Sequence, residues 1–358
     1  MRRRDFTKLA LAGATAGVAA PAIAQSAPTI RWRMTSSFPK SLETIYGGGE
    51  FFAERVNKLT DGKVNIRVFA AGDIVPAFQA LDAVQQGTVE MCHTATYYYV
   101  GKDLTFGFGT AVPFGLTTRQ QNAWLYHGGG NELMNDFLKD YGVVAFPAGN
   151  TGSQMGGWFR NEVNTLADLK GLKMRIPGLG GQVMARLGAV PTALPGGDIY
   201  PALERGAIDA TEWVGPYDDE KLGFYKIAKN YYYPGWWEPC SMYHVMINME
   251  KWNGLPKQYQ EAMISAAREA NIDMVAEYDA KNRLALQRLK AAGVKFHKYS
   301  SDIMQGAYKA ATDMYEEEAA KNPKFKAMYE PWKKFRGEEA QWFALTELAI
   351  SEFFATKL

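Results

Sequence analysis

The chain has 358 residues, which is more than one compact core usually holds, so two lobes or domains are expected. The composition is that of an ordinary globular protein, with 47% hydrophobic and 22% charged residues. The formal net charge is only +2 and the body has no basic tract or acidic tail, so the composition gives no case for binding nucleic acid or a membrane surface.

The first 24 residues have the pattern of an export signal. A charged head at residues 2–4 precedes a weakly apolar stretch at 9–20 and an A-x-A cleavage site at 22–24. Residues 3–8 resemble a twin-arginine signal, which implies export after folding. A membrane anchor is disfavoured because the apolar run is shorter than the ~20 residues needed to span a bilayer. We therefore expect a periplasmic protein that begins near Gln25.

The next part of the chain alternates predicted strands and helices. Strands are predicted over 30–34, 64–69 and 88–93, and helices over 41–59 and 76–86. Pro76 near the first turn and Gly87 after the last turn suit the two ends of the second helix. This alternation predicts an α/β fold with mainly parallel strands.

An internal echo relates residues 83–91 to residues 202–210. Each copy has a helix end, a glycine just after it, and a strand with an acidic residue. The glycines are Gly87 and Gly206. The echo predicts two similar α/β lobes, and a chance likeness between such short stretches is the alternative.

The first lobe is predicted over 28–149 together with about 242–300, and the second over 150–241. The second lobe is expected to hold strands at 156–162, 172–176 and 207–211, a capped turn at 165–171, and helices at 180–187 and 198–205. A strand over 242–248 then returns the chain to the first lobe.

Residues 301–358 are predicted to form helices that follow a long helix over 256–289. The last of them, over 338–356, has an apolar stripe at Trp342, Leu345, Ala349 and Phe353. Because this stripe is too aromatic for a free helix, we expect it to pack on the body or on another subunit. The two cysteines, Cys92 and Cys240, do not make a disulfide framework, and two separate buried thiols are favoured over a bridge.

Arg175 is the first candidate binding residue. It ends a predicted strand just before Pro177, and ligands of open α/β sheets bind outside the carboxyl ends of the strands. A guanidinium at this place offers a planar fork that matches a carboxylate in two parallel hydrogen bonds. A surface arginine at a strand end is the alternative, since exposed arginines are common.

Glu212 and Trp213 also follow the end of a predicted strand. The glutamate is suited to binding a cation or to capping a helix, and the tryptophan to walling a pocket or filling the core. Without other evidence, the structural roles are favoured for both: a helix cap for the glutamate and core filling for the tryptophan. The loop 149–154 joins the two predicted lobes and carries the amides Asn150 and Gln154, although such loops are usually only connectors.

Aromatic residues cluster at 97–99, 231–233 and 236–237, where they are expected to line an interlobe cleft or to fill the core.

The sequence gives little support for an enzyme. The four histidines, His93, His127, His244 and His297, lack metal-ligand spacing, and there is no G-x-S-x-G elbow or P-loop. The glycines at 178–181 lack the full spacing of a dinucleotide loop.

Taken together, the motifs resemble the solute-binding proteins of tripartite ATP-independent periplasmic (TRAP) transporters. The resemblance covers essentially the whole mature chain and is closest to the subgroup that binds 2-oxo acids such as pyruvate, or lactate. It is carried by residues 37–42, 68–72, 149–160, 171–177, 198–209, 210–225 and 231–238.

The resemblance implies a two-lobed periplasmic-binding-protein-like fold of the α/β class, with a hinge and long C-terminal helices. It implies that Arg175 binds the substrate carboxylate. It further implies that Asn150 and one of three tyrosines, Tyr97, Tyr98 or Tyr99, hydrogen-bond the substrate. It also implies a metal cation that bridges substrate and protein. The implied ligands are the side chains of Gln154, Glu212 and Glu238 and the backbone carbonyl of Trp213.

Such an oxygen-rich ligand set suits a hard cation, Ca²⁺ or Na⁺. A substrate whose carboxylate and 2-oxygen both bind the cation would be selected over acids without that oxygen. The resemblance further implies TRAP membrane permease subunits as partners and a homodimer formed through the C-terminal helix. The alternatives are a TRAP binding protein for another organic acid, such as a sugar acid or dicarboxylate, and a secreted enzyme that processes a carboxylate.

Overall fold

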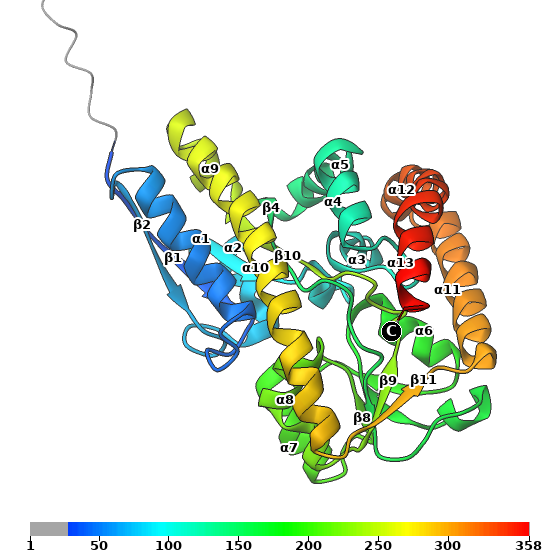
Figure 1. The fold of residues 1–358 in the computed structure, drawn as a ribbon. Helices are drawn as coiled ribbons and strands as arrows, with labels where there is room; N and C mark the ends of the chain where they lie inside the picture. The colour runs from blue at the N-terminus through cyan, green and yellow to red at the C-terminus, as the bar shows by residue number, and fades with distance from the viewer. Residues whose placement is uncertain (1–27, 358) are drawn as a thin grey trace, which may run out of the picture.

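The computed structural model describes residues 28–357, which form two mixed β-sheets with helices packed around each (Figure 1). The predicted export signal at residues 1–24 lies outside the described residues. Within residues 28–357, none of the helices combines the length and the apolar character needed to cross a membrane.

The first sheet has the strand order β2-β1-β3-β10-β4. β1 runs parallel to β2 and β3, whereas β10 runs antiparallel to β3 and β4. The sheet is therefore mixed, because β10 returns from the second lobe and enters in the reverse direction. Its strands are β1 (Ile30–Ser36), β2 (Val64–Phe69), β3 (Met91–Thr94), β4 (Val143–Asn150) and β10 (Met242–Asn248).

The second sheet has the order β11-β9-β5-β8-β6-β7 and repeats this arrangement. β6 is parallel to β7 and β8, and β5 is antiparallel to β8 and β9, just as β10 is antiparallel to β3 and β4. β11 is parallel to β9. The strands are β5 (Trp158–Phe159), β6 (Lys173–Arg175), β7 (Val190–Thr192), β8 (Ala210–Thr211), β9 (Asn230–Tyr233) and β11 (Lys295–Lys298).

The internal echo is a structural repeat. Gly87 and Gly206 have φ angles of +70° and +73°, a conformation that favours glycine. In each copy the amide of the residue after the glycine donates to the carbonyl five residues earlier, at 2.9 Å. The two turns lead into β3 and β8, which occupy equivalent places in their sheets.

Several predicted boundaries differ from the structure. The first helix, α1 (Ile45–Leu59), begins four residues later than predicted because residues 40–44 form turns. The strands predicted at 88–93, 156–162 and 207–211 begin later than predicted, at 91, 158 and 210, because bends and irregular backbone precede them. The remaining helices of the two lobes are α2 (Ala80–Gln85), α3 (Gly107–Thr110), α4 (Thr118–His127), α5 (Gly130–Leu138), α6 (Gly178–Arg186), α7 (Gly196–Glu204), α8 (Pro216–Leu222) and α9 (Met249–Asn253).

The long helix α10 (Lys257–Ala291) runs past both sheets, and packs on α1 and β4 of one lobe and on α8 of the other (Figure 1). Its buried face holds the predicted apolar positions Tyr259, Met263, Ala266, Ala270, Met274 and Tyr278. After α10 the chain enters the second sheet as β11. The predicted extension of the first lobe to about residue 300 is therefore too long.

The C-terminal helices are α11 (Ser301–Lys321), α12 (Pro323–Phe343) and α13 (Ala349–Ala355), the last two joined by a π-helical segment, Ala344–Leu348. The final helix thus begins at Pro323 rather than at 338, since proline is well suited to a first helical turn. Leu345 of the predicted stripe is 79% exposed and Phe353 is 56% exposed, so this stripe does not pack on the body of its own chain. Cys92 and Cys240 are buried and unpaired, as favoured.

Candidate functional site

Arg175 lies at the edge of the second sheet where two parallel strands end. It is the last residue of β6 and pairs with Thr211, the last residue of β8, and the amide of Glu212 donates to the Arg175 carbonyl at 3.2 Å. Parallel neighbours end at the same edge, so Glu212 comes directly beside Arg175. Arg175 is only 1% exposed, which excludes a surface arginine.

The Arg175 guanidinium is held from two sides. Its Nε donates to the Leu194 carbonyl at 3.0 Å and its Nη1 to the Glu212 carbonyl at 3.1 Å. Nη1 also forms a buried ion pair with the Glu212 carboxylate. The guanidinium carbon lies 5.1 Å from the centre of the Trp213 ring, within cation–π range. These contacts fix the guanidinium and leave Nη2 without a partner among residues 28–357.

Three loops meet beside this ion pair. The amide of Gln154 donates to the Glu238 carbonyl at 3.3 Å, and the amide of Gly235 donates back to the Gln154 carbonyl at 3.0 Å. The amide of Met155 donates to the Val214 carbonyl at 3.0 Å. The loop that joins the lobes is thereby tied both to the segment that follows β8 and to the segment that precedes β10. This brings Gln154 and Glu238 to the same place as Glu212.

Glu238 is buried within this cluster, with 3% of its surface exposed. Burial raises the pKa of Glu238 to about 7, against the opposing effects of Ser241, Arg175, Tyr97 and Gln154. Of these residues, Tyr97 belongs to the first lobe, where it follows β3 in a short 3₁₀ turn. The cluster therefore draws on both sheets, at the ends of the equivalent strands β3 and β8.

Four buried polar atoms of this cluster have no hydrogen-bond partner within residues 28–357. They are Arg175 Nη2, Gln154 Oε1, Glu212 Oε2 and Glu238 Oε2. Leaving a buried polar group unpaired costs about 1–3 kcal/mol, and more for a charged group. One donor and three oxygens are the complement of a ligand that presents an anionic oxygen to the arginine and a cation to the oxygens.

The donor set fits a hard cation. All three unpaired ligand atoms are oxygens, which Ca²⁺ and Na⁺ prefer. In the part of the chain that the structure describes, no group of three or more His, Cys, Asp and Glu side chains is placed to hold a metal ion. A cation here would rest on two carboxylates supplemented by amide and backbone oxygens, which is not the nitrogen and sulfur environment typical of zinc.

The electrostatics of the cluster favour an additional positive charge. Burial raises the pKa of Glu212 well above its ordinary value, although Arg175 opposes the rise, and the nearby Glu238 raises it further. Burial also disfavours the charge on Arg175, but Glu212 and its neighbours outweigh this effect and raise the arginine pKa. One guanidinium faces two carboxyl groups, so a cation between them would stabilise both in the ionised form.

The three consecutive tyrosines after β3 have different surroundings. Tyr97 and Tyr98 face the cluster: burial is the main cause that raises both pKa values, and Arg175 opposes the rise for Tyr98. Tyr99 instead points into the core, where its hydroxyl accepts from the Leu81 amide at 3.1 Å. A Cβ on Gly178 would lie 2.5 Å from Tyr97 Cδ2, so glycine at the start of α6 lets the lobes approach closely here.

Asn150 lies where the chain leaves the first sheet. It is the last residue of β4, fully buried, and its Oδ1 accepts from the Gly152 amide at 2.7 Å. Its Nδ2 is 3.2 Å from Cys240 Sγ. The side chain therefore holds together the two crossings between the lobes. Its contact with a ligand stays a prediction.

Asp218, which no sequence pattern indicated as part of the site, supports the Trp213 side chain. Its Oδ2 accepts from Trp213 Nε1 at 3.2 Å and from the Tyr278 hydroxyl at 2.7 Å. Burial raises the pKa of Asp218 to about 7, partly against the effect of these two donors. The adjacent acids after Pro216 carry the signal of an ordinary helix start, and only tertiary packing buries them.

Asp219 supports the backbone of the same segment. Its Oδ1 accepts from the Val214 amide at 3.2 Å, and its Oδ2 accepts from Trp158 Nε1 at 2.8 Å and from the Tyr231 hydroxyl at 2.7 Å. Burial raises the pKa of Asp219 to about 6. The residues that follow β8 are thus anchored to the sheet behind them.

Comparisons with known proteins place the chain in a family. The family model described as bacterial extracellular solute-binding protein, family 7, matches residues 35–322. A monocarboxylate 2-oxoacid-binding periplasmic protein of Nostoc sp. is 55% identical over 326 residues, which cover 91% of this chain and 89% of that protein.

Two solved structures share the fold closely. One is a TRAP transporter solute-binding protein of Bordetella bronchiseptica, described as a mixed-occupancy dimer with a site that holds copurified calcium and picolinate and an apo site. It is 48% identical, covers 92% of this chain and 98% of its own, and has a TM-score of 0.91. The other, from Pseudoalteromonas atlantica, has bound sodium and pyruvate. It is 39% identical, covers 90% and 99%, and has a TM-score of 0.88.

Proposed function

The chain belongs to the bacterial extracellular solute-binding proteins of family 7, and we propose that it captures a small 2-oxo or 2-hydroxy monocarboxylate, such as pyruvate, for a TRAP transporter. It is a binding protein and not an enzyme, in keeping with its relatives. The observation that carries the proposal is the unpaired, buried Nη2 of Arg175 beside the unpaired oxygens of Gln154, Glu212 and Glu238.

In the proposed complex, Arg175 donates to the substrate carboxylate through Nη2. The side-chain oxygens of Gln154, Glu212 and Glu238 and the backbone carbonyl of Trp213 would hold Na⁺ or Ca²⁺, which when bound supplies the positive charge for the carboxylate and the 2-oxygen. Two structural neighbours, one with calcium and picolinate and one with sodium and pyruvate, support this choice of cations. Tyr97, Tyr98 and Asn150 would complete the hydrogen bonds to the substrate.

The cation explains the proposed selectivity. An acid with a 2-oxo or 2-hydroxy group offers two oxygens in one plane, whereas an acid without it leaves a coordination position empty. The charges also suit a monocarboxylate. A substrate carboxylate adds a third negative charge to the two acidic side chains, and Arg175 with a divalent cation balances the set.

We further propose that ligand capture closes the two lobes. The first lobe comprises residues 28–149 with β10 and the first part of α10. The second comprises residues 150–241 with β11, and the C-terminal helices lie within residues 301–355. A ligand bound at the ends of β3 and β8 would contact both lobes and so favour the closed state.

The remaining proposals concern transport. The family implies an extracytoplasmic location and membrane permease partners, and the arginines at residues 3–4 favour export by the twin-arginine route. The exposed apolar side chains of the C-terminal helix, Trp342, Leu345, Leu348, Phe353 and Phe354, favour a homodimer that covers them. Light scattering tests the dimer: Leu345→Glu should give a monomer, and a wild-type monomer at high concentration would contradict the proposal.

The alternative is a family member that binds a dicarboxylate or a sugar acid. Thermal unfolding of the mature protein with pyruvate, 2-oxobutyrate, lactate and succinate, in buffer with both sodium and calcium, separates the two. We expect the 2-oxo and 2-hydroxy monocarboxylates to raise the melting temperature and succinate to leave it unchanged. An equal rise with succinate would remove the proposed preference.

A further inference from the structure

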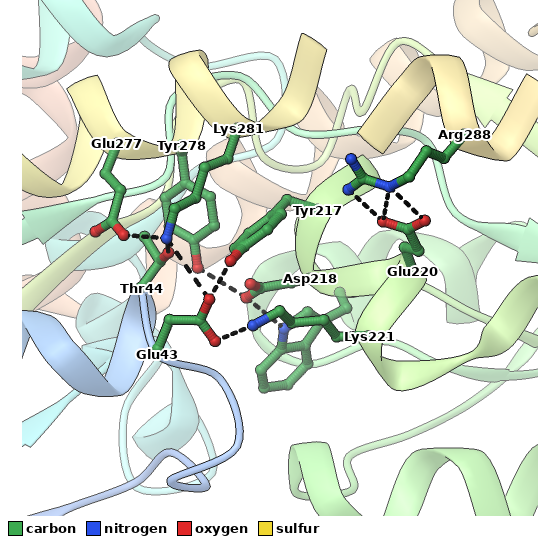
Figure 2. A network of polar contacts seen from close by, with 11 residues as sticks. Glu43, Thr44, Tyr217, Asp218, Glu220, Lys221, Glu277, Tyr278, Lys281 and Arg288 are labelled. Carbon is green, nitrogen blue, oxygen red and sulfur yellow. Dashed lines mark hydrogen bonds and ion pairs between the residues drawn. The ribbon is translucent and has the colours of Figure 1, made fainter. Parts of the chain in front are cut away.

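A second polar cluster joins the lobes outside the binding site, and it is centred on Glu43. This residue lies in the first lobe, in the turn just before α1. Its carboxylate accepts from the Tyr217 hydroxyl and pairs with Lys221 Nζ, both on α8 of the second lobe. Figure 2 shows these side chains converging on Glu43 from the opposite side. The contact therefore joins a turn of the first lobe to a helix of the second lobe, and the two lie far apart in the sequence.

The long helix α10 adds a third donor to the same cluster. Lys281 Nζ lies 3.6 Å from Glu43 Oε1 and 3.4 Å from Thr44 Oγ1, and it also pairs with Glu277 one turn away. Two ammonium groups lie close to the ring of Tyr217: Lys221 Nζ and Lys281 Nζ are each 4.7 Å from the ring centre. Glu43 is the acidic group from the first lobe that balances these two cations.

The second-lobe side of the cluster is held firmly. The amide of Tyr217 donates to Asn282 Oδ1 at 2.9 Å. Figure 2 shows the pair of Glu220 with Arg288, whose nearest atoms are 2.6 Å apart. Asp218, between these residues, is hydrogen-bonded to Tyr278 of α10. The first turn of α8 and the second half of α10 are therefore locked together, whatever Glu43 does.

The same turn of α8 is tied to the binding site. Asp218 accepts from the indole of Trp213, the ring that lies against Arg175. Tyr217, the residue just before Asp218, faces Glu43. A single helical turn thus carries one residue that supports the site and another that reaches across to the first lobe.

We propose that Glu43 is an interlobe latch, which closes when Tyr217 and Lys221 reach it and so slows the escape of bound ligand. The inference rests on the proposed function, because it requires lobes that close on a ligand. Each ion pair of the latch is expected to be weak, because the side chains of Glu43, Lys221 and Lys281 are 48%, 31% and 31% exposed. Exposed ion pairs contribute little singly, and a network of three donors on one carboxylate contributes more.

The test compares the kinetics of pyruvate binding in the mature wild-type protein and in Glu43→Gln, by stopped-flow tryptophan fluorescence with sodium and calcium present. We expect the dissociation rate to rise about three- to tenfold and the association rate to change by less than about twofold, because the latch forms after encounter. Glu54→Gln is the matched control, since Glu54 lies on α1 but pairs within its own helix with Lys58.

A second variant shows whether the contact itself is responsible. Lys221→Met should raise the dissociation rate as well. The dissociation rate of the double variant with Glu43→Gln should be about that of the faster single variant, because both changes break the same contact. A dissociation rate in Glu43→Gln equal to that of the wild type would overturn the latch, even if the melting temperature of the variant fell.

Failure of the latch and failure of the proposed function can be told apart. Wild-type protein that binds none of the 2-oxo and 2-hydroxy acids would contradict the proposed function. Wild-type protein that binds pyruvate, together with a Glu43→Gln variant that releases it at the wild-type rate, would overturn the latch alone and leave the proposed function standing.

Discussion

The two polar clusters that join the lobes differ in burial and in hydrogen-bond satisfaction. The inner cluster, around Arg175 and Glu212, has its ion pair 1% exposed on both sides and leaves several polar atoms without partners in residues 28–357. The outer cluster, around Glu43, is half exposed, and its carboxylate has three donors. The inner cluster is incomplete without a ligand, whereas the outer one is complete as it stands.

The difference separates two tasks. Buried charges with unpaired polar atoms cost free energy, and only a ligand with matching groups removes that cost. The inner cluster is therefore expected to determine which molecule binds. Exposed and fully paired charges gain little from any particular ligand, so the outer cluster is expected to set how long the closed state lasts.

Replacing Arg175 should have the largest effect. Arg175→Met removes the carboxylate donor and leaves Glu212 buried without its partner, which typically costs about 3–5 kcal/mol of stability. Pyruvate affinity should fall by about 100-fold or more in calorimetry. Arg175→Lys keeps the charge but loses the planar fork, so it should recover stability better than affinity. Micromolar pyruvate binding in Arg175→Met would place the carboxylate elsewhere.

Replacing Glu212 with glutamine should distinguish the contribution of the cation to pyruvate binding from that of Arg175. Glu212→Gln retains the shape and one oxygen but removes a negative charge, so the cation should bind more weakly and pyruvate affinity should fall by about 10- to 100-fold. Elemental analysis of the purified variant checks the cation. Calcium content equal to that of the wild type would contradict the ligand role of Glu212.

Asp218 tests the support behind the inner cluster. Asp218→Leu leaves the Trp213 and Tyr278 donors unpaired, at about 1–3 kcal/mol each, and should weaken pyruvate binding by about tenfold. Asp218→Asn is the matched control. It keeps an acceptor oxygen and removes a carboxylate whose pKa burial already raises to about 7, so it should bind almost as well as the wild type. Equal binding by both variants would show that the indole needs no support.

Ionic strength should affect only the outer cluster. Exposed charges are screened by salt, whereas buried pairs are screened much less. Choline chloride, added at constant sodium and calcium, should raise the pyruvate dissociation rate of the wild type by about twofold, and should leave that of Glu43→Gln nearly unchanged. The same salt dependence in both proteins would argue that Glu43 is not the group being screened.

The two clusters also differ in how far the sequence predicts them. Strand ends, helix caps and the echo around Gly87 and Gly206 are local, so the α/β class, the two similar lobes and the position of Arg175 at a strand end could be predicted from the sequence. The family resemblance added Glu238 and gave Gln154 and Glu212, which were already candidates by position, a role in binding a cation. The structure brings these three residues together beside Arg175.

Tertiary packing decides what the sequence left open. No local pattern indicates that Asp218 and Asp219 are buried, since acids after a proline at a helix start are usually solvated. Glu43 meets α8 only because α10 packs on both lobes, a contact across more than 170 positions of the chain. The antiparallel direction of β10 and the placement of β11 in the second sheet likewise depend on where the chain crosses between lobes.

The central claim is that a bound cation and Arg175 together hold a 2-oxo carboxylate between the lobes. Calorimetric titration of pyruvate into protein depleted of sodium and calcium, in a choline buffer with chelator, tests it most directly. We expect binding heat to be absent in that buffer and to return when calcium or sodium is added in excess. Pyruvate binding with undiminished affinity in the cation-free buffer would contradict the account.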